Sequence, residues 1–138
     1  MKLTVLGASG GFPVAGGATS GYLLSFDNRN ILIDCGSGVL SNLFRFIRVE
    51  QLDAVILTHL HEDHICDMPI LQYAIDLSRR YGVNCPTIPV FSPSTPEQVA
   101  ERLKSDGEMI IGQISAGGEL PMYGATLHFY LMDHPVET

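Results

Sequence analysis

One stretch of the sequence decides the fold: THLHEDH, residues 58–64. It follows a short apolar run, 53–57, that is typical of a strand buried on both faces, and it precedes a helical pattern over 68–81. The stretch therefore lies at the carboxyl end of a buried strand, where α/β folds place their ligands. Three of the five histidines fall inside it. We interpret it as a ligand-binding loop rather than a polar surface loop.

The spacing of these side chains predicts a site for divalent cations. In an extended segment, residues two apart point the same way, so His59 and His61 can bind one cation. Asp63 and His64 follow as the chain turns toward the helix, and they project to a neighbouring point. Imidazole and carboxylate ligands suit Zn²⁺, Mn²⁺ or Fe²⁺, with Zn²⁺ as the first choice. Two such cations roughly 4 Å apart can hold a bridging hydroxide and bind a substrate oxygen.

The flanking sequence alternates strands and helices, which indicates an α/β chain. Strands are predicted at 2–6, 19–26, 31–34, 53–57, 88–91, 108–114, 119–122 and 125–132, and helices at 39–48, 68–81 and 96–103. In the last helix Thr95 is the predicted cap and Pro96 the first helical residue. A glycine-rich segment, 7–17, joins the first two strands. We interpret it as a flexible loop near the metal site, and contact with substrate is left open.

Size, charge and cysteines limit the possible classes of protein. A chain of 138 residues is enough for one domain, and its net charge of −7 argues against general nucleic-acid binding, although bound cations would reverse the potential locally. It contains neither an apolar run of about 20 residues that could cross a membrane nor the features of a signal peptide. Cys35, Cys66 and Cys85 are odd in number and lack a CxxC spacing. They predict reduced thiols in a cytoplasmic protein.

The HxHxDH segment, 59–64, resembles the signature of the metallo-β-lactamase superfamily. ILIDCG at 31–36 resembles the family's first motif, and DHPV at 133–136 resembles the loop that supplies a third histidine. The LTVLGASGGFP and TSGYLL stretches resemble the ribonuclease Z-like and related phosphodiesterase branch. HICDMP at 64–69 departs from the His-x-x-Gly-Leu-Pro of ribonuclease Z, which favours a related phosphodiesterase over a transfer-RNA processing enzyme.

The resemblance implies five metal ligands: His59, His61, Asp63, His64 and His134. In this assignment the first, second and last bind one cation, and the other two bind the second. Asp34 is implied to accept a hydrogen bond that orients a ligand histidine. Asp63 is also implied to act in catalysis, by accepting a hydrogen bond from the metal-bound water.

The resemblance also implies the architecture and the activity. The expected fold is α/β, half of a four-layer αββα sandwich, with a mixed sheet and helices on one face, as a single domain over 1–138. In this family a bridging aspartate and a final histidine come from the C-terminal half and are missing here. We therefore expect a fragment truncated after the third ligand motif and inactive by itself. The implied function is that of a metal-dependent phosphodiesterase, acting on RNA or a smaller nucleotide through a metal-bridging hydroxide.

Two other functions stay open at this point. The same fold could hydrolyse a thioester, lactone or lactam bond. Alternatively, the chain could be a non-catalytic half-domain that self-associates, because it would expose a sheet edge and an apolar face. The expected partner is then a second copy or a missing C-terminal half, and no membrane partner is expected.

Overall fold

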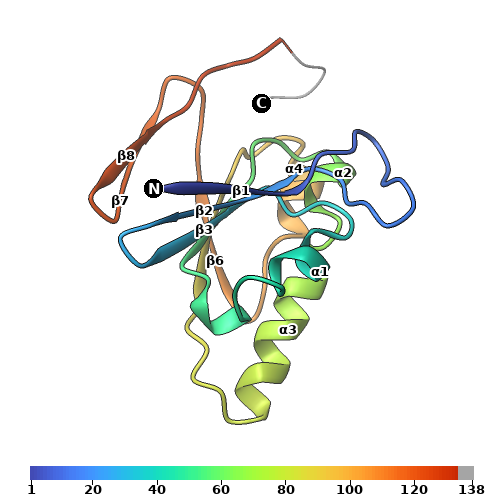
Figure 1. The fold of residues 1–138 in the computed structure, drawn as a ribbon. Helices are drawn as coiled ribbons and strands as arrows, with labels where there is room; N and C mark the ends of the chain where they lie inside the picture. Colours follow the sequence, from blue (N-terminus) through green and yellow to red (C-terminus); the bar gives the residue numbers. More distant parts are fainter. Residues whose placement is uncertain (134–138) are drawn as a thin grey trace.

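Strands and helices alternate along the chain, as the sequence pattern predicts. The computed structural model describes residues 1–133, and Figure 1 shows their course. The elements are β1 (Lys2–Gly7), β2 (Gly21–Phe26), β3 (Arg29–Ile33), α1 (Val39–Leu43), the 3₁₀ helix η1 (Val49–Gln51), β4 (Ala54–Ile56), α2 (Glu62–Ile65), α3 (Met68–Arg80), β5 (Ile88–Ser92), α4 (Glu97–Glu101), β6 (Met109–Gln113), β7 (Glu119–Met122) and β8 (Ala125–His128).

Strands β1 to β6 form one mixed sheet in the order of the sequence. The pairs β1–β2 and β2–β3 are antiparallel, whereas β3, β4, β5 and β6 run parallel to their neighbours. Asp27 and Asn28 close the β2–β3 hairpin with φ values of 46° and 60°, which aspartate and asparagine tolerate better than most residues. Because parallel strands end at the same edge, the segment after β4 emerges beside the segments after β3 and β5.

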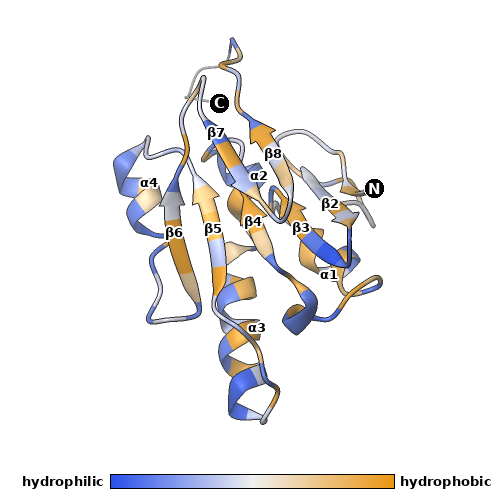
Figure 2. Ribbon diagram, turned by 90° about the vertical axis from the view of Figure 1, so that its left-hand side faces the viewer, coloured by the Kyte–Doolittle hydropathy of each residue, from blue (hydrophilic) through white to orange (hydrophobic). Residues whose placement is uncertain are grey.

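The two faces of the sheet are covered by different elements. Leu32 on one face packs in a cluster with Leu71 of α3, and both are fully buried. Ile31 and Ile56 point to the other face, where they pack with Met122 of β7. Figure 2 shows the β7–β8 hairpin lying across the central strands on the side opposite α3. The alternation of side chains along each strand thus separates a helical layer from a hairpin layer, and the predicted α/β fold with helices on one face of a mixed sheet is confirmed.

The hairpin is attached to the sheet by polar contacts at its turn. The Tyr123 hydroxyl donates to the carbonyl of Asp53 at 3.0 Å, and the Arg29 guanidinium lies 4.6 Å from the centre of the Tyr123 ring. Arg29 also pairs with the Asp53 carboxylate at 2.8 Å. These contacts hold the turn against β3 and the residue before β4, so the hairpin has a defined position over the sheet.

The first helix is shorter than the predicted 39–48. Helix α1 ends at Leu43, and η1 follows after a turn. Val39, Leu40 and Leu43 are buried, but Phe44 is 45% exposed. In the rest of the predicted range, 44–48, only Ile47 packs against the core, so the apolar pattern there does not form a continuous buried helical face that would stabilise further turns.

Two other predicted boundaries were wrong. Pro96 adopts an extended ψ of 134° and is the residue before α4, so the helix begins at Glu97 and Thr95 is not its cap. Strand β8 ends at His128 rather than continuing through 132, because its partner β7 begins at Glu119 and offers no further strand residues for pairing. Among the helices in residues 1–133, none has the length and apolar character that crossing a bilayer requires.

Candidate metal centre

The candidate site lies where the chain leaves β4 and enters α2. His59 is buried, with 4% of its surface exposed, and His61 is the residue before α2. Asp63 and His64 lie inside this single helical turn. The ring centres of His59 and His64 are 3.9 Å apart, and those of His59 and His61 are 5.0 Å apart. The structure therefore brings the three imidazoles together at the edge of the sheet.

The carboxylate of Asp63 faces the same cluster. Its Oδ2 atom lies 3.6 Å from Nε2 of His64. The donor types, imidazole and carboxylate, fit Zn²⁺ or a related divalent metal. In the chain as described, 1–133, no group of three or more His, Cys, Asp or Glu side chains already has the geometry of a metal site. The predicted ligand His134 lies outside the described residues, so the structure places the other predicted ligands but not this one.

Asp34 lies beneath the cluster and connects its parts. It is 1% exposed, and its φ of 58° lies in the left-handed region, which residues other than glycine seldom adopt. The carboxylate accepts the Ser20 hydroxyl at 3.2 Å and the Thr58 backbone N–H at 2.9 Å. Its Oδ2 lies 2.7 Å from Nδ1 of His64. Because a carboxylate accepts and does not donate, Nδ1 of His64 carries the proton, and Nε2 carries the lone pair that a metal requires.

The electrostatics of the pair Asp63 and His64 are set by their neighbours. Burial would lower the pKa of His64, but the hydrogen bond to Asp34 and the charges of Asp34 and Asp63 outweigh burial and raise that pKa. Burial would raise the pKa of Asp63, but the Gly11 N–H and the charge of His64 outweigh it and lower that pKa. Asp63 is therefore kept in its anionic form, whereas a cation at His64 would have to compete with a proton.

Backbone contacts fix the turn that carries these ligands. The Cys35 N–H donates to the carbonyl of His64 at 2.7 Å. At Gly36 a Cβ atom would lie 1.9 Å from the carbonyl oxygen of Asp63, so only glycine permits this close approach. From the other side, the Gly11 N–H donates to Oδ2 of Asp63 at 3.0 Å. The ligand turn is thus held between the segment after β3 and the loop after β1.

Three supporting residues were not singled out from the sequence: Ser20, Thr58 and Gly11. Thr58 directly precedes the first histidine, and its position at the end of a buried strand is the one signal that could have found it. The Gly11 contact joins residues 52 apart in the chain. The glycine-rich composition of that loop predicts flexibility, but it contains no signal for a particular hydrogen bond.

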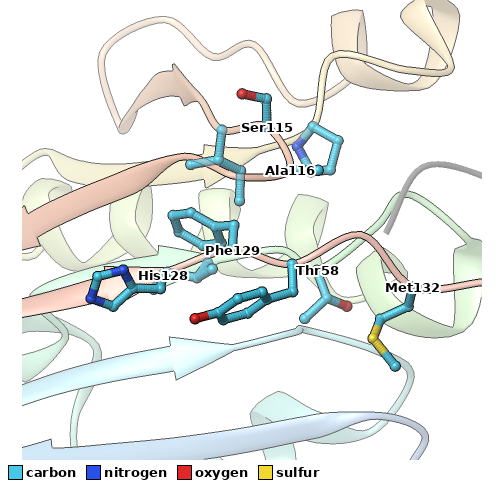
Figure 3. Close-up of a pocket in the computed structure, with 10 residues that line it drawn as sticks. Thr58, Ser115, Ala116, His128, Phe129 and Met132 are labelled. Atoms are coloured by element: carbon cyan, nitrogen blue, oxygen red, sulfur yellow. The ribbon is translucent and has the colours of Figure 1, made fainter.

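An apolar pocket adjoins the cluster on the hairpin side of the sheet. Its volume is about 310 Å³, and Ile56, Thr58, Phe129 and Met132 are among the residues that line it. Figure 3 shows Thr58 and Met132 toward one end of this pocket and His128 toward the other. The pocket and the histidine cluster therefore share Thr58, which brings apolar binding space next to the site.

The fold and the site define a class of protein that the comparisons identify. The family model of the metallo-beta-lactamase superfamily matches residues 14–84, which include the whole THLHEDH stretch. The chain belongs to the metallo-beta-lactamase superfamily.

Individual relatives agree with this assignment. The probable metallo-hydrolase YhfI of Bacillus subtilis (strain 168) is 48% identical over 91 residues, which are 66% of this chain and 37% of that protein. Ribonuclease Z of Haloferax volcanii is 27% identical over 128 residues, which are 93% of this chain and 36% of that protein. The aligned segments thus span little more than a third of the length of each of these two relatives.

Solved structures show the same fold. The crystal structure of the metallo-beta-lactamase fold protein YhfI from Bacillus subtilis superposes with a TM-score of 0.93 at 37% identity, covering 98% of this chain and 55% of that one. Zn²⁺-bound PqqB from Methylobacterium extorquens gives a TM-score of 0.68 at 17% identity, covering 95% and 52%, and this likeness shows the fold alone. The predicted metallo-β-lactamase-like architecture is therefore confirmed.

Proposed function

We propose that this chain forms the metal-binding part of a metal-dependent hydrolase that cleaves phosphodiester bonds. The observation that carries the proposal is the arrangement at the end of β4. There the ring centre of His59 lies 3.9 Å from that of His64 and 5.0 Å from that of His61, with the Asp63 carboxylate beside His64. Beneath them the Asp34 carboxylate is placed to orient the His64 imidazole, as an acceptor behind a metal ligand commonly does.

Each side chain has a separate role in this proposal. His59 and His61, together with the predicted ligand His134, would hold one divalent cation, and Asp63 and His64 would hold a second. The bound cations would supply Lewis-acid activation of water and neutralise charge on the substrate. Asp63 would accept a hydrogen bond from the attacking water. The lowered pKa of Asp63 supports this role, because only the ionised carboxylate is a full acceptor.

A phosphodiester, in RNA or a smaller nucleotide, is the proposed substrate class. The support is sequence similarity to ribonuclease Z along 93% of the chain. The net charge of −7 is compatible with a phosphate substrate only if cations reverse the local potential, which this site would provide. We propose Zn²⁺ as the cation, with Mn²⁺ or Fe²⁺ as alternatives, because imidazole and carboxylate ligands suit all three.

Hydrolysis of bis-(p-nitrophenyl) phosphate by the full-length protein, with whatever segment or second copy completes the site and loaded with Zn²⁺ or Mn²⁺, tests the proposal. We expect turnover of this diester and none of a chromogenic lactam. The variant His61→Ala should lose at least about a hundredfold in kcat/KM, since one ligand of the cluster is removed. The matched control is Tyr81→Ala, because Tyr81 is an exposed aromatic residue that directly follows the last residue of α3.

Other outcomes would decide for the alternatives. Lactam, lactone or thioester turnover without diester turnover would replace the phosphodiester by an acyl substrate. Unchanged diester hydrolysis in His61→Ala would refute the role of the cluster. Elemental analysis of the purified protein would identify the metal.

Completion of the site by a further segment or by a second copy stays a prediction, as does a cytoplasmic location. Leu3 and Val5 on β1 are 57% and 59% exposed, which supports contact of this strand with another surface. Light scattering tests whether a second copy of the chain completes the site, and a clean monomer would contradict this prediction.

A further inference from the structure

Thr58 connects the buried carboxylate to the first histidine of the cluster. Its Oγ1 atom lies 3.0 Å from each oxygen of the Asp34 carboxylate. The same Oγ1 atom lies 3.1 Å from Nδ1 of His59. Thr58 thus touches both Asp34 and His59, whereas Asp34 reaches His64 directly.

The direction of these hydrogen bonds follows from the number of protons available. A threonine hydroxyl has one proton to donate, and a carboxylate can only accept. The Thr58 hydroxyl therefore donates to Asp34, and its lone pair is left to face Nδ1 of His59. A hydrogen bond at that contact requires the proton to be on Nδ1. The lone pair of His59 is then on Nε2, the same nitrogen that His64 presents through its own contact with Asp34.

We propose that Thr58 is a positioning residue that sets the tautomer of His59 through Asp34, so that one buried carboxylate orients two ligand imidazoles. The consequence for the cation rests on the proposed function, because it supposes that His59 is a ligand. The tautomer itself does not depend on that function.

The tautomer of His59 can be measured without metal, activity or substitution. Long-range ¹H–¹⁵N NMR correlation of the imidazole rings in the metal-free full chain, at a pH above 8, distinguishes the two neutral tautomers. We expect His59 to be protonated on Nδ1. Protonation on Nε2 in the unsubstituted chain would overturn the inference.

Three variants test the role of the hydroxyl. Thr58→Val keeps the shape and removes the hydroxyl, whereas Thr58→Ser keeps the hydroxyl and removes the methyl group. The matched control is Thr87→Val, because the Thr87 hydroxyl also joins a hydrogen-bond network, with the carbonyl of Gly107, before β5 at the opposite edge of the sheet. We expect Thr58→Val to weaken Zn²⁺ binding by about 10- to 100-fold. Thr58→Ser should stay within a few-fold of the unsubstituted chain, and Thr87→Val should not change the affinity.

The visible spectrum of the Co²⁺-loaded protein gives a second measurement. The bands should change in Thr58→Val and be restored in Thr58→Ser. Equal losses in both Thr58 variants would show that keeping the hydroxyl does not preserve the site, and would overturn the inference. If the unsubstituted chain binds no metal while His59 is protonated on Nδ1, the proposed function fails and the role of Thr58 as an orienting residue stands.

Discussion

Nδ1 of His64 lies 2.7 Å from Oδ2 of Asp34, although 30 residues separate the two in the chain. The contact joins the end of β3 to α2, and it exists because β3 and β4 are parallel neighbours that end at the same edge of the sheet. The sheet thereby places an acceptor beneath a candidate metal ligand. Four predictions follow from the chemistry of this site and of the core that supports it.

Replacing Asp34 by Asn should weaken metal binding by about 10- to 100-fold, because the amide offers one acceptor oxygen and turns donors toward Ser20, Thr58 or His64. Asparagine tolerates the positive φ of this position, so the backbone can stay in place. Isothermal titration with Zn²⁺ measures the change. The matched control is Asp53→Asn, whose carboxylate accepts the Asn30 N–H far from the cluster. Equal losses in both variants would contradict a specific role for Asp34.

The stability of the metal-free chain should depend on the protonation of His64. Its pKa is raised in the folded state, so protonation stabilises folding. This contribution is fully present below the unfolded value of about 6.5 and is lost as pH rises through the folded pKa. Urea unfolding between pH 5.5 and 8.5 should therefore show a declining midpoint that His64→Gln lessens. His128→Gln is the control. If the difference in midpoint between the unsubstituted chain and His64→Gln grew with rising pH, the predicted sign would be wrong.

The hydrogen bond from the Gly11 N–H should affect the metal affinity of the site more than the flexibility of the loop does. Gly11 and Gly16 have φ values of 56° and 73°, and a Cβ at either would meet nothing within 4 Å. Substitution by Ala therefore imposes similar backbone strain at both positions. Of these two glycines, only Gly11 donates its N–H to the Asp63 carboxylate. We expect Gly11→Ala to weaken Zn²⁺ binding about tenfold and Gly16→Ala to leave it within about twofold. The same affinity in both variants would exclude a specific function of the Gly11 contact.

Helix α3 should contribute stability through one face only. Leu71 is fully buried, whereas Ile70, its neighbour, is 57% exposed. Leu71→Ala should lower the free energy of unfolding by about 2–5 kcal/mol, because it removes buried methyl groups and leaves a cavity. Ile70→Ala should change it by less than about 0.5 kcal/mol. Urea unfolding of both variants measures the difference, and similar losses would mean that Ile70 is covered in solution.

Local sequence pattern determined the order of elements and the location of the candidate site. The run DAVIL, 53–57, is apolar enough to be a buried strand, and β4 occupies its centre. The helical spacing over 68–81 corresponds to α3 to within one residue. Such patterns are readable because strand and helix periods place apolar side chains on one face within a few residues. The same reasoning was wrong at the end of α1, where apolar residues such as Phe44 continue the spacing without being buried.

The sequence by itself determined which residue types are available near position 60, and therefore that imidazole and carboxylate donors suited to a divalent metal occur together. The resemblance to a family already implied Asp34 as a supporting residue, but only the tertiary structure decided which histidine it contacts and that Gly11 contacts Asp63. Asp34 and Gly11 reach the cluster because strand pairing sets the register of β1, β2, β3 and β4. Register is a property of the whole sheet: a shift by one residue would turn each side chain to the other face. No local pattern around Asp34 or Gly11 contains that information.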